Sequence, residues 1–357
     1  MRTDIFYWKC DSPISVEQKK NQFFRNKYTD QTREYVSLAV YDFLGHAPDQ
    51  LESMKSDGNH LTAIFTNGSE KFLFRGDEGH AIEDDYILAE SAVMNMLHHA
   101  GLAVPPVYNT DISIKKYPFR FQIMECVPYP CLNKFAKDGT LNEMKIAEQS
   151  GRFLAHVHNL HFEGYGFINT EILAKENRMT GLDPSAAAYF NKRLNDHISY
   201  LTEHDLLDAR QEERIRTAFS KAVPLLDSVK GSLLHRDYAY WNILGTPDTI
   251  ERVIDWDDCV SGDPADDFGI VNCFLPPELL EQILKSYTEI REIDDSFRVR
   301  IHMHTVRNML WKAMIRHYMG YFDMGKDFFL TGPGGMPLKE YTLYKINTEL
   351  TTLENLL

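Results

Sequence analysis

Residues 233–258 read LLHRDYAYWNILGTPDTIERVIDWDD and are the most informative part of the chain. It contains the pattern H-x-D at His235 and Asp237, and Asn242 follows shortly afterwards. Two apolar runs flank the turn-forming sequence GTPDT, so the segment is expected to form a loop that leads into a β-hairpin. Asp255 comes directly after the second predicted strand. The pattern therefore predicts that three polar side chains meet on one surface.

This combination of side chains suits phosphoryl transfer. The reaction needs a carboxylate that orients a hydroxyl and accepts its proton, together with oxygen ligands that hold Mg²⁺ against the phosphates. Asn carbonyls and Asp carboxylates are the hard oxygen donors that Mg²⁺ prefers. A single Asp or Asn in a loop usually forms a turn. The ordered set Asp237, Asn242 and Asp255, with a hairpin between the last two, favours a phosphoryl-transfer centre instead.

A second motif follows, with IDWDD at 254–258 and GDPADDFG at 262–269. Taken with the preceding loop, it resembles the aminoglycoside phosphotransferase / choline kinase-like family over about residues 50–275. The resemblance implies an α+β, protein-kinase-like two-lobed fold, with a small β-rich N-lobe and a larger helical C-lobe. It also implies a small-molecule kinase that uses Mg²⁺ and takes ATP or GTP as phosphoryl donor.

The resemblance also assigns roles within these motifs. It implies that Asp237 is the catalytic base and that Asn242 and Asp255 are the metal ligands. Asp267 matches the structural Asp of the family's D-P-x-x-D-L pattern, with Phe268 in the Leu position. The D-F-G sequence that begins at Asp267 holds Mg²⁺ in protein kinases. We nevertheless expect the metal at Asp255, because one short hairpin lets it reach the same ion as Asn242. Asp267 is expected to be buried and to accept hydrogen bonds from the catalytic loop.

The small lobe is expected to bind the nucleotide. The resemblance implies a phosphate loop at 56–60, where Gly allows the backbone to approach phosphate oxygens closely. Its candidate contacts are Ser56, Gly58 and Asn59. Arg75 occupies the strand position where protein kinases use Lys for the α- and β-phosphates, and Glu90 on the following helix would pair with it.

The segment Met124-Glu125-Cys126-Val127 resembles a kinase hinge. The carbonyl of Glu125 and the amide of Val127 are expected to face the purine. Contacts made by backbone atoms do not depend on the side chains, so the hinge leaves ATP and GTP equally open as donors.

The periodicity of apolar residues divides the chain into three parts. Strands are expected around 51–55, at 61–65 and 71–75 with Asn67-Gly68 as their turn, and at 119–127; helices are expected from 84, at 144–160, 186–207 and 212–229, and after 277. The expected domains are a helical N-terminal extension (1–47), an N-lobe with phosphate loop and hinge (48–127), and a helical C-lobe with catalytic loop and substrate cleft (128–357).

Bulk properties limit the partners. The formal net charge of −14 offers no basic stripe for nucleic acid, and no apolar stretch is long enough to span a membrane. The five cysteines are scattered and form no C-x-x-C pair. We therefore expect a cytoplasmic protein with no nucleic-acid or membrane partner.

Two other kinds of protein share parts of this pattern. A protein kinase is disfavoured, because only residues 256–266 separate Asp255 from Asp267 and no A-P-E segment follows. A nucleotide-binding pseudokinase is disfavoured because the base and both metal ligands are present. The expected acceptor is a cationic or polyhydroxylated small molecule, an aminoglycoside-like antibiotic or else a metabolite such as choline, homoserine or a sugar. Acids and aromatic residues after 277 are expected to line its cleft, including Glu278, Glu281, Trp311, Tyr318, Tyr321, Phe322, Asp323 and Asp327.

Overall fold

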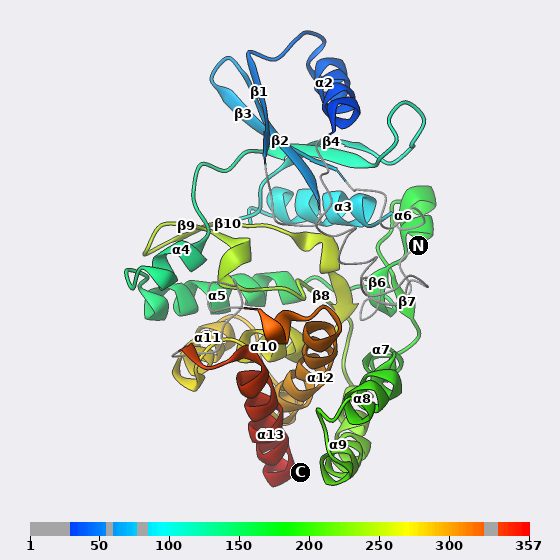
Figure 1. Cartoon of the computed structure of the whole chain (residues 1–357), viewed down its shortest axis with the longest axis vertical. Coiled ribbons are helices and arrows are strands. Elements are labelled where there is room, and N and C mark those ends of the chain that lie inside the picture. Colours follow the sequence, from blue (N-terminus) through cyan, green and yellow to red (C-terminus); the bar gives the residue numbers. More distant parts are fainter. Residues whose placement is uncertain (1–28, 55–59, 77–84, 325–334) are drawn as a thin grey trace.

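The computed structural model describes residues 29–54, 60–76, 85–324 and 335–357. These form a small lobe built on an antiparallel sheet and a larger lobe that is mostly helical (Figure 1). The predicted α+β, two-lobed architecture is thus confirmed. Residues 1–28 of the predicted N-terminal extension, the predicted loop at 56–59 and most of the predicted break at 332–335 lie outside the described residues.

The small lobe contains five strands in the order β1-β2-β3-β5-β4. Their bounds are β1 Gln50–Met54, β2 Leu61–Asn67, β3 Glu70–Gly76, β4 Val107–Asp111 and β5 Phe121–Glu125. The predicted turn at Gly68, whose φ is 60°, joins β2 to β3, and Asn67 pairs with Glu70 across it. Gly tolerates this left-handed backbone without the steric cost that a Cβ would bring.

Helix α2 (Asp30–Leu44) covers one face of this sheet (Figure 1). Residues on alternate positions of β2, namely Leu61, Ala63 and Phe65, are buried against Val36 and Val40 of the helix. Alternate residues of the strand share one face, and residues four apart share one face of the helix, so the two apolar faces can pack together. Helix α3 (Tyr86–His99) lies between the sheet and the large lobe (Figure 1), and its apolar residues belong to the core of the large lobe.

The large lobe is built from helices. They are α4 Leu132–Lys137, α5 Glu143–His158, α6 Thr170–Glu176, α7 Ala186–Asn191, α8 Leu194–Glu203, α9 Ala209–Ala222, α10 Ala265–Asn272, α11 Pro277–Thr288, α12 Phe297–Tyr318 and α13 Leu338–Leu356. The single helix expected at 186–207 is wrong: the chain breaks between α7 and α8, where Arg193 has a left-handed φ of 56°.

Short strands flank the loop that lies within residues 233–258. A four-stranded sheet has the order β7-β6-β11-β8, with bounds Gly181–Asp183, Tyr165–Ile168, Val260–Gly262 and Ser232–Leu234. The predicted hairpin is present as β9 (Ile243–Gly245) and β10 (Ile250–Val253). Strand β8 therefore ends just before His235, and the hairpin begins just after Asn242.

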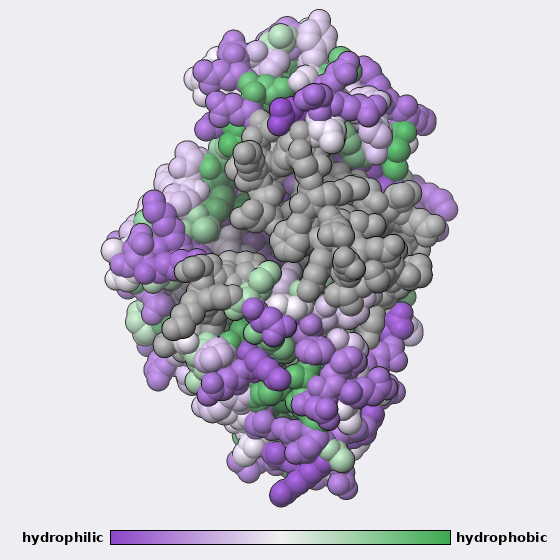
Figure 2. Space-filling view, viewed as in Figure 1, coloured by the Kyte–Doolittle hydropathy of each residue, from purple (hydrophilic) through white to green (hydrophobic). Residues whose placement is uncertain are grey.

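The described surface on the face shown in Figure 2 is largely hydrophilic, with hydrophobic residues gathered in small patches. Within the described parts of the chain, no helix combines the length and the apolar character that crossing a bilayer requires.

Candidate active site

The loop from His235 to Asn242 is fixed from below by Asp267, at the start of α10. Its carboxylate accepts hydrogen bonds from the backbone N–H groups of His235 and Arg236, both at 2.8 Å. Nε2 of His158, from α5, lies 3.2 Å from the same carboxylate. Burial alone would raise the pKa of Asp267, but the hydrogen bonds from His158 and from the His235 backbone lower it. Asp267 thus has the buried contacts expected of a residue that holds the loop in place.

Arg236 anchors the loop to two helices. Its backbone has a left-handed φ of 70°, which is uncommon for a residue with a side chain. The buried guanidinium donates to Asp266 of α10 at 2.5 Å and to Asn308 of α12 at 3.3 Å. These contacts compensate for the strained backbone conformation. They also hold the next residue, Asp237, in a fixed position.

Two neighbouring side chains orient the carboxylate of Asp237. Its Oδ2 accepts hydrogen bonds from Nε1 of Trp241 at 3.1 Å and from Nδ2 of Asn242 at 2.8 Å. Among the described residues, Oδ1 has no hydrogen-bond partner. One carboxylate oxygen is therefore held by the protein, and the other can meet a substrate hydroxyl.

The structure brings Asp255 to the same place. The backbone N–H of Ile254 donates to the carbonyl of Asn242 at 3.0 Å, which joins the end of the hairpin to the loop. Because Nδ2 of Asn242 donates to Asp237, its Oδ1 is the atom left to accept or to ligate. Asp255 itself has a left-handed φ of 67°.

The residues around Asp255 have the character of a cation site. One ligand atom each from His60, Asp255 and Asp257 lies within 4.8 Å of the others. The pKa of Asp255 is raised well above its usual value, mainly by loss of hydration and to a smaller extent by the negative charge of Asp257. Bringing carboxylates this close is unfavourable unless a positive charge is added. Together with Oδ1 of Asn242, these oxygens fit a hard divalent cation such as Mg²⁺.

Arg75, on β3, places a positive charge beside these carboxylates. It forms salt bridges with Glu90 of α3 and with Asp255, and its Nη2 lies 3.5 Å from Asp257. Burial opposes its charge, but these three carboxylates raise the pKa of Arg75 above its usual value. Burial also raises the pKa of Glu90 to about 7, although the charge of Arg75 acts in the opposite direction. The expected pairing of Arg75 with Glu90 is therefore present.

The structure describes only some of the remaining residues that were predicted to contact the nucleotide. Ser56, Gly58 and Asn59 lie outside the described residues. Glu125 ends β5, and its side chain pairs with Arg252 at 3.0 Å. The amide of Val127 has no hydrogen-bond partner among the described residues, so it is available to a ligand.

Sequence reasoning missed the aromatic wall beside Asp237. The rings of Trp241 and Phe274 lie 4.9 Å apart at 85°, and Phe274 follows α10. Nζ of Lys312, on α12, lies 4.8 Å from the ring centre of Phe274 and 5.2 Å from that of Trp311. Of these residues only Trp311 was expected near the substrate. Trp241 directly precedes Asn242 in the sequence, and this position was the one signal that could have placed it near the catalytic loop.

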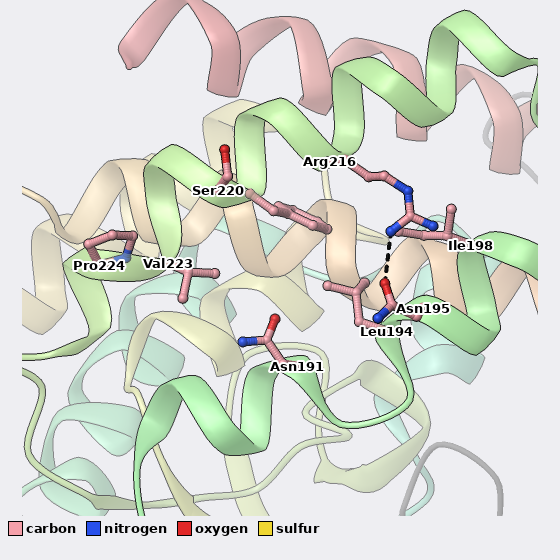
Figure 3. A pocket seen from close by; sticks show the side chains of 9 residues that line it. Asn191, Leu194, Asn195, Ile198, Arg216, Ser220, Val223 and Pro224 are labelled. Carbon is pink, nitrogen blue, oxygen red and sulfur yellow. Dashed lines mark hydrogen bonds between the residues drawn. The ribbon is translucent and has the colours of Figure 1, made fainter.

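A separate pocket lies among α7, α8 and α9, with a cavity volume of about 340 Å³ (Figure 3). Arg216 points across it and donates to Asn195 at 2.8 Å, as well as to Glu212 at 2.8 Å. The described residues that line this pocket include no carboxylate. It therefore lacks the acid groups that phosphoryl transfer requires.

Comparisons with known proteins find phosphotransferases and kinases. A model of the phosphotransferase enzyme family matches residues 56–299. The crystal structure of aminoglycoside phosphotransferase APH(4)-Ia is similar, with a TM-score of 0.63 and 13% identity over 90% of this chain and 99% of that chain.

A thermostable mutant of the same enzyme, in a ternary complex with AMP-PNP and hygromycin B, has a TM-score of 0.62 at 13% identity over 89% of this chain and 98% of that one. A candidate fructosamine-3-kinase from Thermobifida fusca has a TM-score of 0.60 at 16% identity over 88% and 98%. No curated protein sequence matches the chain.

Proposed function

The chain belongs to the phosphotransferase enzyme family, whose members transfer phosphate to alcohol groups, and we propose that it moves the γ-phosphate of ATP or GTP onto a hydroxyl of a small molecule. The observation that carries the proposal is the carboxylate of Asp237. Trp241 and Asn242 hold one of its oxygens, and the other is left for the acceptor.

Asp237 is proposed as the catalytic base. The acceptor hydroxyl donates its hydrogen bond to Oδ1, and the proton passes to this oxygen as the new phosphate ester bond forms. The hydrogen bonds from Trp241 and Asn242 keep the carboxylate from rotating. Correct orientation of this kind accounts for much of the catalysis in phosphoryl transfer.

The nucleotide is proposed to lie between the lobes. The backbone of Glu125 and Val127 would meet the purine, and Arg75 would pair with the α- and β-phosphates. Ser56, Gly58 and Asn59 would surround the terminal phosphates, and Glu90 would keep Arg75 in place. The complex of the APH(4)-Ia mutant with AMP-PNP supports nucleotide binding by this fold.

Asn242 and Asp255 are the proposed metal ligands. When bound there, Mg²⁺ would neutralise the charge on the phosphate oxygens. The close approach of the carboxylates of Asp255 and Asp257 beside Arg75 supports this assignment.

The proposed acceptor is a polyhydroxylated small molecule. The expectation of an aminoglycoside-like antibiotic is supported by the neighbour that binds hygromycin B. A metabolite kinase is the second candidate, and the cation at Lys312, beside the proposed acceptor position, favours it. A pseudokinase is disfavoured because Asp237, Asn242 and Asp255 stand together in one site.

The test is acceptor-dependent turnover. Purified protein with Mg²⁺ and either ATP or GTP is assayed for nucleoside diphosphate release across a panel of sugars, amino sugars, sugar acids and choline. Release that requires an acceptor, together with transfer of labelled phosphate to it, is the expected result. Failure to bind either nucleotide, or nucleotide binding without transfer to any acceptor, would overturn the proposal.

A further inference from the structure

Lys312 is a cation in an unusual setting. Its amine lies over the rings of Phe274 and Trp311, at 4.8 and 5.2 Å from their centres. Among the described residues it forms neither an ion pair nor a hydrogen bond. Burial lowers the pKa of Lys312, which reflects the cost of removing an ammonium from water. A partly buried charge without a carboxylate calls for an explanation.

Arg316 repeats this feature one helical turn further along α12. It is 3% exposed, and Nη1 donates to Oγ1 of Thr342 at 2.7 Å. Among the described residues it has no carboxylate partner. Burial lowers the pKa of Arg316 to about 10. Residues four apart share a helix face, so Lys312 and Arg316 create a local positive potential.

Three other buried cations in the large lobe each lie beside a carboxylate. Arg236 has Asp266 at 2.5 Å, Arg300 has Asp263 at 2.8 Å and Lys345 has Glu349 at 2.7 Å. The chain as a whole carries a net charge of −14. Acids are therefore plentiful in this chain, yet no carboxylate among the described residues pairs with Lys312 or Arg316.

The position of Lys312 connects it with the reaction. Trp241 donates to the carboxylate of Asp237, the ring of Trp241 packs on Phe274, and Lys312 covers Phe274. The negative charge of Asp237 also reaches Lys312, and acts against the effect of burial on its pKa. The aromatic wall therefore runs from the proposed base to an amine without a counter-ion.

We propose that Lys312, with Arg316 behind it, binds an oxyanion of the acceptor, so that the substrate is an acidic hydroxyl compound bearing a carboxylate or a phosphate ester. This inference rests on the proposed function and narrows it. The hydroxyl meets Asp237, the carbon skeleton packs on Trp241 and Phe274, and the oxyanion pairs with the amine of Lys312. An amino group at the same place would be repelled, so of the two proposed acceptor classes this inference selects the metabolite over the polycationic, aminoglycoside-like antibiotic.

The experiment compares acceptors of similar size that differ in charge. The probes are glucuronate, glucose and glucosamine, and then glycerate, glycerol and serinol; the corresponding sugar and glycerol phosphates separate a phosphate-binding site from a carboxylate-binding one. The kcat/KM of each is measured with wild type, Lys312→Met and Lys312→Glu. Lys285→Met is the matched control, because Lys285 is exposed on α11 and loses the same charge.

We expect an acid to be the best substrate of each scaffold. Lys312→Met should lower kcat/KM for that acid on the order of 10- to 100-fold, mainly through KM, and leave the neutral compound within about twofold. Lys312→Glu should move the preference towards the amine, and Lys285→Met should change nothing. Melting temperatures show whether each variant is folded, and removal of an unpaired amine is expected to leave them unchanged.

Three results would overturn the inference. The first is a wild-type protein that prefers the neutral or the amine probe. The second is a Lys312→Met variant whose kcat falls equally for every acceptor, since Lys312 would then act on Asp237. The third is turnover of no acid while other hydroxyl compounds are phosphorylated. Failure of the proposed function is a different result, in which no probe of any charge accepts phosphate.

Discussion

The carboxylate of Asp267 lies 3.2 Å from Nε2 of His158, and neither side chain is exposed. This contact joins α10 to α5 beneath the catalytic loop. The two oxygens of Asp267 also accept the backbone N–H groups of His235 and Arg236. The conformation of the loop therefore depends on one buried carboxylate.

Replacement of Asp267 by Asn should lower stability. The amide can accept with one oxygen only, so one of the buried N–H groups loses its partner. We expect the free energy of unfolding to fall by about 1–3 kcal/mol. Urea denaturation of the wild type and of Asp267→Asn measures this, with the exposed Asp323→Asn as control. An unchanged denaturation midpoint would contradict the structural role.

Stability should also fall in acid. Burial would raise the pKa of Asp263, but His304 at 2.9 Å and Arg300 at 2.8 Å lower it, and the pKa of Asp267 is lowered as well. Because the folded-state pKa lies below the unfolded value, the stabilisation is complete above about pH 4 and is lost as pH falls through the folded pKa.

Urea denaturation at a series of pH values from about 6 to about 3 checks this. The free energy of unfolding should decrease towards acid in the wild type. Asp263→Asn should be less stable at neutral pH but show a flatter dependence, because one of the titrating carboxylates is gone. Parallel curves for the two proteins would show that Asp263 does not contribute to the acid sensitivity.

Gly151 should tolerate no side chain. In an ordinary helix, Gly→Ala stabilises by about 0.5–1 kcal/mol. Gly151, however, lies where α5 meets α11, and a Cβ there would come within 2.2 Å of the carbonyl oxygen of Ile283. We expect Gly151→Ala to destabilise by about 1–3 kcal/mol through overpacking. Thermal unfolding shows whether Gly151→Ala lowers or raises the stability, with Ser37→Ala on the exposed side of α2 as control. A gain in stability would contradict the prediction, because it would show that α11 can move away from the added methyl group.

Much of the fold could be predicted because its signals are local. Asn67-Gly68 between two apolar runs predicts the β2–β3 hairpin, and the spacing of Asn242 and Asp255 predicts the β9–β10 hairpin. The four-stranded sheet was missed, since β8 and β11 have three residues each and carry no alternation to recognise. Such strands form because the rest of the large lobe brings them together.

The residues of the site likewise include some that local sequence predicts and some that it does not. Asp237, Asn242 and Asp255 lie within one short stretch of sequence, so their order alone indicates that they meet. Lys312 reaches the same region from α12, and no pattern around it in the sequence distinguishes it from a surface lysine. The place of Lys312 in the site is therefore visible only in the structure.

Trp241 should influence catalysis without touching the nucleotide. Its indole N–H donates to Oδ2 of Asp237 at 3.1 Å, and its ring packs on Phe274. Trp241→Phe keeps an aromatic ring but removes the hydrogen bond, so we expect kcat to fall roughly 10-fold because one bond is worth about 1 kcal/mol or more. Steady-state kinetics should show an unchanged KM for the nucleotide. If kcat is unchanged, Asn242 alone orients the base.

Asp255→Asn should separate the metal site from the D-F-G sequence at Asp267. Loss of hydration and the charge of Asp257 raise the pKa of Asp255, so its carboxylate opposes folding at neutral pH, and the neutral amide should leave stability equal or higher. Mg²⁺-dependent transfer should nevertheless fall by at least about 100-fold, because a ligand charge is lost. Urea denaturation and a Mg²⁺ titration of turnover in Asp255→Asn and Asp267→Asn test both statements. Full activity in Asp255→Asn, with Mg²⁺ dependence lost only in Asp267→Asn, would reverse the assignment and place the ion at Asp267.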